Sequence, residues 1–223
     1  FERAIEDFSK AIELDPNDAE AYYNRGLAYA KLGKYEQAIK DYDKAIKLNP
    51  ALAEAYNNRG LTYAELNEHE RAIEDYDKAI KLNPNFAEAY YNRGIAYTKL
   101  NQYEQAIEDF SRVIKLNPNF AEAYYNRGIA YAKLNQYEQA IEDFSKAIEL
   151  NPALAEAYYN RGLTYAKLNK YERAIEDYDK AIELNPALAE AYANIGIVYL
   201  KIRRYEEAAR DLKRAGIFFL LSG

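Results

Sequence analysis

Two polar residues recur side by side in an otherwise apolar stretch of this sequence. The heptapeptide "EAYYNRG" begins at residues 20, 88, 122 and 156, with near-copies "EAYNNRG" at 54 and "EAYANIG" at 190. Arginine is costly to bury alone, and its planar guanidinium binds carboxylates and other anions at two points. A carboxamide offers donors and an acceptor, which suits a peptide bond. The two series therefore predict ion pairs or anion sites, and a surface that binds peptide.

Each arginine has an aspartate at a constant separation along the chain. On helical spacing Arg25 shares a stripe with Ala21, and Asp41 shares a stripe with Ala38, so both charges point into packing. We expect partly buried, two-point pairs that set the register of a helical hairpin; a ladder of anion-binding arginines is the alternative. The expected pairs are Arg25 with Asp41, Arg59 with Asp75, Arg93 with Asp109, Arg127 with Asp143, and Arg161 with Asp177.

The elements that hold these residues repeat with a period of 34, which is the spacing of all six prolines. Each unit has two segments of helical periodicity, "AEAYYNRGLAYAKL" and "YEQAIKDYDKAIKLN" in the first complete one. The second is amphipathic, whereas the first is apolar nearly all round and must be covered by neighbouring units. We expect one array over residues 1–223: an orphan second helix at 1–18, full repeats at 19–52, 53–86, 87–120, 121–154 and 155–188, and a diverged repeat with an apolar tail at 189–223.

Turn residues support this division. The turn inside each full hairpin carries a residue that tolerates the left-handed conformation ending a helix. Proline after Asn or Asp then stops the second helix and favours the start of the next. The predicted left-handed residues are Gly33, Asn67, Asn101, Asn135 and Asn169.

The repeat resembles the tetratricopeptide repeat, whose signature is W-x2-L-G-x2-Y, A-x3-F and P at period 34. The resemblance rests on Tyr22, Gly26, Tyr29, Ala38, Tyr42 and Pro50, and it extends over essentially the whole chain. Two departures recur, because Tyr replaces Trp and Arg replaces Leu. The resemblance implies an all-α, right-handed superhelical α-solenoid of antiparallel hairpins. In such a solenoid the first helices line a concave groove, and the array is a scaffold for protein interactions.

By the geometry of that family, the asparagine stripe faces the groove and resembles the asparagine ladders of its peptide-binding members. The ladder would be Asn24, Asn58, Asn92, Asn126, Asn160 and Asn194. The groove floor beside it would be Tyr23, Leu27, Leu61, Tyr91, Ile95, Tyr125, Ile129, Tyr159, Leu163 and Ile197. Hydrogen bonding of these amides to neighbouring helices or to groove water is the alternative. The family's carboxylate clamp is not expected, because Tyr23, Leu27 and Glu20 occupy its basic and amide positions.

No constellation predicts catalysis, a cofactor or a metal site, so an enzyme is not expected. Cysteine is absent, and the sole histidine, His69, stands where other repeats have Tyr and reads as a packing variant. Ser9, Ser111 and Ser145 alternate with Asp at one position of the second helix and recur beside no base. The 24 tyrosines suggest a stacking platform for single-stranded nucleic acid, but most occupy core positions of the repeat.

The expected partner is a protein, bound as an extended peptide or as a helix. A net charge of −6 with interleaved signs disfavours nucleic acid, and no apolar run reaches the roughly 20 residues that span a bilayer. We therefore expect a soluble protein and favour the cytoplasm, with the true N-terminus outside this sequence. The alternative function is head-to-tail self-association through apolar ends, with Phe218, Phe219 and Leu220 contacting a second copy or folding back.

Overall fold

The computed structural model describes residues 1–221, and side chains for residues 1–216. The described chain consists of helices joined by short turns. They are α1 (Glu2–Leu14), α2 (Ala19–Lys31), α3 (Tyr35–Leu48), α4 (Ala53–Glu65), α5 (His69–Leu82), α6 (Ala87–Lys99), α7 (Tyr103–Leu116), α8 (Ala121–Lys133), α9 (Tyr137–Leu150), α10 (Ala155–Lys167), α11 (Tyr171–Leu184), α12 (Ala189–Lys201) and α13 (Tyr205–Leu221).

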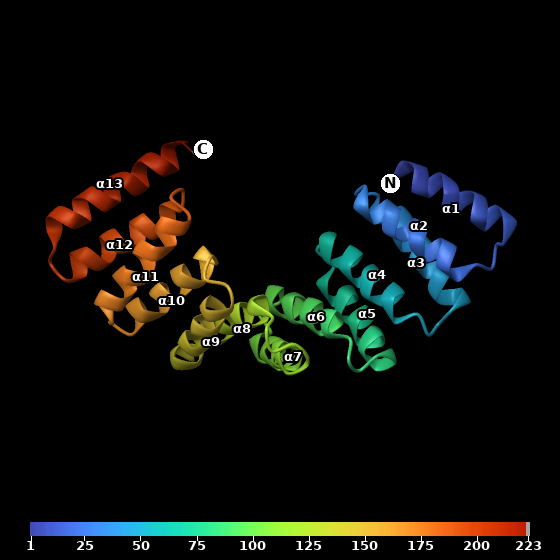
Figure 1. Cartoon of the computed structure of the whole chain (residues 1–223), viewed down its shortest axis with the longest axis horizontal. Helices are drawn as coiled ribbons and strands as arrows, with labels where there is room; N and C mark the ends of the chain where they lie inside the picture. Colours follow the sequence, from blue (N-terminus) through green and yellow to red (C-terminus); the bar gives the residue numbers. More distant parts are fainter. Residues whose placement is uncertain (222–223) are drawn as a thin grey trace. The chain divides into compact units, whose positions relative to one another are not determined.

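The chain forms two compact units, Phe1–Leu116 (unit 1, α1 to α7) and Asn117–Gly223 (unit 2, α8 to α13). Within each unit, consecutive helices pack side by side as antiparallel pairs, such as α2 with α3 and α10 with α11 (Figure 1). First helices of neighbouring hairpins also touch, as α2 does with α4 and α8 with α10. The all-α fold of successive hairpins predicted from the sequence is confirmed.

Small residues allow the two helices of a hairpin to pack closely. A Cβ atom built at Gly94 of α6 would lie 2.8 Å from Cε1 of Phe110 in α7, closer than packed carbon atoms lie. Glycine at this position therefore admits the aromatic ring of the second helix. Around that ring Ala106 and Val113 are fully buried, so the hairpin core consists of one large side chain among small ones.

The turns inside the hairpins have the predicted left-handed conformation. Gly33 has φ of 70°, and Asn67, Asn101, Asn135 and Asn169 have φ between 57° and 60°. Asparagine tolerates this region because its side chain bonds locally, and here Oδ1 of Asn101 accepts the hydroxyl of Tyr103 at 2.6 Å. Arg203 also has a φ of 63°, which the sequence did not indicate.

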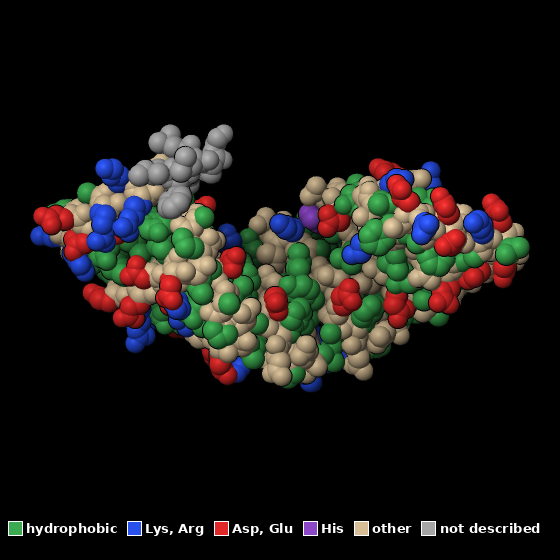
Figure 2. All heavy atoms as spheres, turned by 45° about the horizontal axis from the view of Figure 1, so that its top comes forward, with side chains coloured by type: hydrophobic (Ala, Val, Ile, Leu, Met, Phe, Trp, Pro, Cys, Tyr) green, Lys and Arg blue, Asp and Glu red, His purple; other side chains and the backbone are tan. Residues whose placement is uncertain are grey.

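Charged side chains of both signs are interspersed over the face shown in Figure 2. Within residues 1–221, no helix is both long and apolar enough to cross a membrane. The expectation that Phe218, Phe219 and Leu220 contact another copy falls outside the residues whose side chains are described.

Candidate peptide-binding groove

All five arginines expected to form pairs do so within their own hairpin. Nε and Nη2 of each guanidinium donate to the two carboxylate oxygens of the aspartate 16 residues later, over 2.6 to 2.8 Å. The aspartate side chains are 5 to 8% exposed and the arginines 17 to 19%. The pairs are Arg25 with Asp41, Arg59 with Asp75, Arg93 with Asp109, Arg127 with Asp143, and Arg161 with Asp177.

Burial makes the charged form of the paired aspartates costly. Desolvation raises the pKa of Asp75, Asp109 and Asp143, and the facing guanidinium opposes that rise. Each carboxylate therefore depends on its arginine to remain charged inside the hairpin. Four of the five arginines lie near two aromatic rings, as Arg93 does near Tyr90 and Tyr97, whose centroids lie 5.5 and 5.7 Å from Cζ.

A third contact ties Arg25, Arg59, Arg93 and Arg161 to the preceding repeat. Nη1 of Arg25 lies 3.0 Å from the hydroxyl of Ser9, and Nη1 of Arg161 lies 2.9 Å from that of Ser145. The equivalent partner of Arg93 is the carboxylate of Asp77. Sequence reasoning missed this contact between repeats, although the alternation of Ser and Asp at one position was its signal. Because the guanidinium edges are already occupied by protein groups, the alternative of anion-binding arginines is disfavoured.

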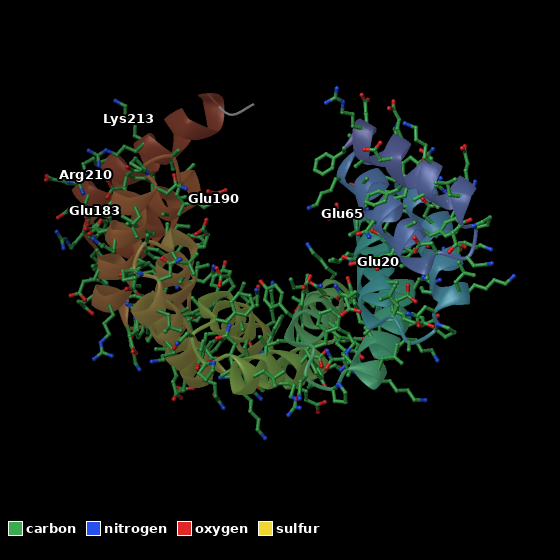
Figure 3. The ribbon with its side chains drawn as sticks, turned by 45° about the vertical axis from the view of Figure 1, so that its right-hand side comes forward. Glu20, Glu65, Glu183, Glu190, Arg210 and Lys213 are labelled. Carbon is green, nitrogen blue, oxygen red and sulfur yellow. The ribbon has the colours of Figure 1, made fainter. Side chains whose placement is uncertain are left out.

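The last repeat shows what replaces the arginine. Ile195 occupies its position and is 2% exposed, while Asp211 of α13 remains 3% exposed. Asp211 accepts from Nε and Nη2 of Arg210 at 3.0 and 3.1 Å (Figure 3 labels Arg210). A buried aspartate at this position is thus supplied with a cation even where the usual arginine is absent.

The asparagines of the predicted ladder bond to the preceding first helix. Nδ2 of Asn58 donates to the hydroxyl of Tyr23 at 2.9 Å and to the carbonyl of Glu54 at 3.0 Å. Asn160 makes the same two bonds, with the hydroxyl of Tyr125 at 3.1 Å. Both amide protons of these two side chains are therefore committed. Their Oδ1 atoms receive no hydrogen bond within the described part of the chain.

The remaining asparagines follow the same scheme in part. Asn194 donates to the hydroxyl of Tyr159 at 2.9 Å, and Asn126 donates to the carbonyl of Glu122 at 2.9 Å. Asn92 donates to Oδ1 of Asn57 at 3.2 Å, because Asn57 stands where four of the other repeats have Tyr. The contact to a neighbouring helix, one of the two alternatives left open by the sequence, is thus present in the structure.

The groove tyrosines are half-buried against the second helix of their own hairpin. Their rings lie 5.9 to 6.1 Å from the core aromatic ring, centroid to centroid. The pairs are Tyr23 with Tyr42, Tyr91 with Phe110, Tyr125 with Phe144, and Tyr159 with Tyr178. Three of them, Tyr23, Tyr125 and Tyr159, also accept the hydrogen bonds of ladder asparagines, and none of the four lines the cavities described next.

Equivalent cavities lie between consecutive first helices in each unit. Their volumes are about 350 Å³ between α2 and α4, 310 Å³ between α4 and α6, and 340 Å³ between α8 and α10. Each has aliphatic side chains from both first helices, a core aromatic residue and a ladder asparagine in its wall. The aliphatic residues are Leu27, Leu61, Ile95, Ile129 and Leu163, the aromatic ones Tyr42, Tyr76 and Phe144, and the asparagines Asn58, Asn92 and Asn160.

Besides the four groove tyrosines, four predicted groove residues lie outside these cavity walls: Asn24, Asn126, Asn194 and Ile197. Ile197 of α12 is 47% exposed, and Asn24 is half-buried at the start of the series in unit 1. His69 lines the cavity between α4 and α6, as Tyr35 and Tyr137 line the equivalent ones. Its Nδ1 is buried and has no hydrogen-bond partner in the described structure. The imidazole takes the position of the repeat's tyrosine.

Repeated hairpins of this kind, with a cavity recurring along their first helices, are typical of helical-repeat proteins that mediate protein interactions. The chain belongs to the tetratricopeptide repeat family, which matches residues 19–52, 87–120, 121–154 and 155–188. Two further descriptions, TPR repeat and tetratricopeptide repeat, match residues 1–33 and 60–100, and residues 41–74 and 177–210. The family generally mediates protein interactions and is generally non-catalytic.

Solved structures resemble the chain over most of its length. The crystal structure of YrrB, described as a TPR protein with an unusual peptide-binding site, is 32% identical, with 82% of this chain and 95% of YrrB covered at a TM-score of 0.74. A crystal structure of MamA is 31% identical, covering 73% of this chain and 95% of MamA at a TM-score of 0.71. MamA 41-end from Desulfovibrio magneticus RS-1 is 28% identical, covering 76% and 96% at a TM-score of 0.73. No curated protein sequence matches this chain.

Proposed function

We propose that the first-helix face of each unit binds a segment of a partner protein as an extended peptide. The observation that supports this most directly is the cavity series of 310 to 350 Å³, repeated between consecutive first helices. A single packing defect would not recur with the same aliphatic, aromatic and asparagine lining. Such concave, mostly apolar cavities with a few polar groups are typical of binding sites.

The spacing of the cavities suits an extended chain. Packed helices lie about 8 to 10 Å apart, and an extended peptide advances roughly 3.3 Å per residue. About every third peptide residue would therefore meet a new cavity. Its side chain would enter between two aliphatic residues, such as Leu27 and Leu61 in unit 1.

The hydrogen bonds that the asparagines make within the protein determine which backbone group of a peptide they can bind. Because the amide protons of Asn58 and Asn160 are committed to protein acceptors, each amide presents its oxygen to a ligand. That oxygen accepts a hydrogen bond from a backbone N–H of the peptide. The ladder therefore binds the peptide main chain and does not select its sequence. With the ordering cost of a flexible ligand, roughly micromolar affinity is expected. The likeness to YrrB, whose structure is described as having a peptide-binding site, supports the same function.

The test is a titration of fluorescent, unfolded peptides of about nine residues, a length that extends beyond two neighbouring cavities of one unit. The double variant Asn58→Ala, Asn160→Ala should bind peptide about 2- to 13-fold more weakly at the site of each unit, because each site loses one hydrogen bond of about 0.5 to 1.5 kcal/mol. The matched control is Tyr23→Phe, Tyr125→Phe, which removes the bonds to the amides but leaves their oxygens in place.

Near-wild-type affinity in the tyrosine control, with loss in the asparagine variant, supports direct contact with peptide. An equal loss in both variants would assign the asparagines to packing between repeats. If no peptide of the set binds the wild-type chain at high micromolar concentration, the proposed function is wrong.

A further inference from the structure

The three groove cavities share size and floor but differ in charge at the last turn of their first helices. The cavity between α8 and α10 is lined there by Lys133 and Lys167, and no carboxylate lines it. The cavities of unit 1 contain one lysine each, Lys31 or Lys99, and both include Glu65. Glu65 projects from the end of α4 (Figure 3) and takes a position that is lysine in each of the other first helices.

The two lysines that line the cavity of unit 2 are available to a ligand. Lys133 and Lys167 are exposed, and neither forms an ion pair within the described residues. No acidic residue stands three or four positions away from either lysine along the sequence. This cavity is therefore positive on a chain whose net charge is −6.

Each uncharged polar side chain of this cavity makes at least one hydrogen bond to the protein, although Oδ1 of Asn160 remains open. The amide of Asn160 donates to Tyr125, and the hydroxyl of Thr164 donates to the carbonyl of Asn160. Oδ1 of Asn135 accepts the hydroxyl of Tyr137 at 2.6 Å. The two ammonium groups are thus the charged donors left to a ligand, above a floor that includes Phe144.

We infer that the cavity between α8 and α10 selects an acidic side chain of the bound peptide. The carboxylate lies between Lys133 and Lys167, and its methylene groups and apolar neighbours rest on the floor. Glu65 abolishes this preference in the unit 1 cavities because its carboxylate neutralises the lysine opposite. This inference rests on the proposed function. A lysine at a helix C-terminus also interacts favourably with the helix dipole, which is the purely structural alternative.

The experiment compares three capped peptides of about nine residues, identical except for a central Glu, Gln or Lys flanked by leucines, against the full chain. We expect binding in the order Glu, Gln, Lys, with about tenfold between the extremes and a smaller ratio at high salt. The variant Lys133→Gln, Lys167→Gln should lose the preference. The control Lys146→Gln, Lys180→Gln removes the same charge from second helices, where these lysines pair with Glu149 and Glu183, and should keep it.

A second variant tests the role of Glu65. Glu65→Lys should increase the affinity or number of sites for the Glu peptide, because it gives the unit 1 cavities the lysine pair of unit 2. Thermal unfolding of each variant without peptide measures the effect of the charge on the helix end, because that effect does not depend on the peptide. Binding of all three peptides with equal affinity, or equal loss in the control, overturns the charge selection alone. Absence of binding by all three overturns the proposed function as well.

Discussion

Replacing Arg93 by leucine tests whether its guanidinium is needed to keep the buried carboxylate of Asp109 charged inside the hairpin. The change removes the two bonds to Asp109, whose side chain is 5% exposed, and the contact to Asp77. Breaking a buried pair by removing one partner costs about 3 to 5 kcal/mol. Asp109 can escape by binding a proton, which at pH 7 costs about 4 kcal/mol from an ordinary pKa near 3.9. We therefore expect a loss of about 3 to 4 kcal/mol in the free energy of unfolding.

The dependence on pH follows from burial, which raises the pKa of Asp109. With Arg93 removed, nothing opposes this rise. A carboxyl whose pKa is higher in the folded state destabilises the fold when it is ionised, and the loss shrinks as pH falls through that raised pKa. The deficit of Arg93→Leu should thus be smaller at pH 4.5 than at pH 7. Arg93→Ala should cost about 1 to 2 kcal/mol more than leucine, because apolar contact with Tyr90 and Tyr97 is also lost.

Urea unfolding followed by circular dichroism measures these differences, with hydrogen exchange of α6 and α7 to locate them. The companion variant Arg93→Leu, Asp109→Asn removes the unpaired charge and should recover at least half of the loss. A deficit below about 1 kcal/mol for Arg93→Leu would refute the reasoning, since that is the range of an exposed pair. A deficit that is unchanged between pH 7 and pH 4.5 would refute it equally.

Three further changes test other parts of the structure. Burial raises the pKa of Tyr178 above its usual value near 10, so its contribution to stability is present below pH 10 and is lost above it by about 1.4 kcal/mol per pH unit. In denaturation measured at pH 9 and pH 11, Tyr178→Phe should therefore lose less stability on going to pH 11 than the wild-type chain. Ser145→Asp should create with Arg161 the ion pair that other repeats make, raising stability by up to about 1 kcal/mol at low salt, with no gain in 1 M salt. Arg203→Gly should raise the melting temperature, because Arg203 holds a left-handed φ of 63° at the position of Gly33, and this conformation costs about 1 to 2 kcal/mol in a side-chain-bearing residue.

The sequence determined the local structure because the relevant signals lie within one repeat. A period of 34 with apolar residues at helical spacing defined both helices of each hairpin. Gly33 and Asn67 marked left-handed turns through their own conformational preferences. The pairing of Arg25 with Asp41 was also predictable, because two charges 16 residues apart in a tight hairpin come to the same height on facing helices.

The contacts between repeats were decided by the tertiary structure. Asn58 reaches the hydroxyl of Tyr23, 35 residues earlier, and Arg161 reaches Ser145 in the preceding hairpin. The partners of each bond belong to different hairpins, and their distances depend on how far one hairpin is shifted and rotated against the next. That geometry is set by the packing of small residues and aromatic rings between helices. It therefore also decides which amide atom remains open to a ligand, and where the cavities between first helices form.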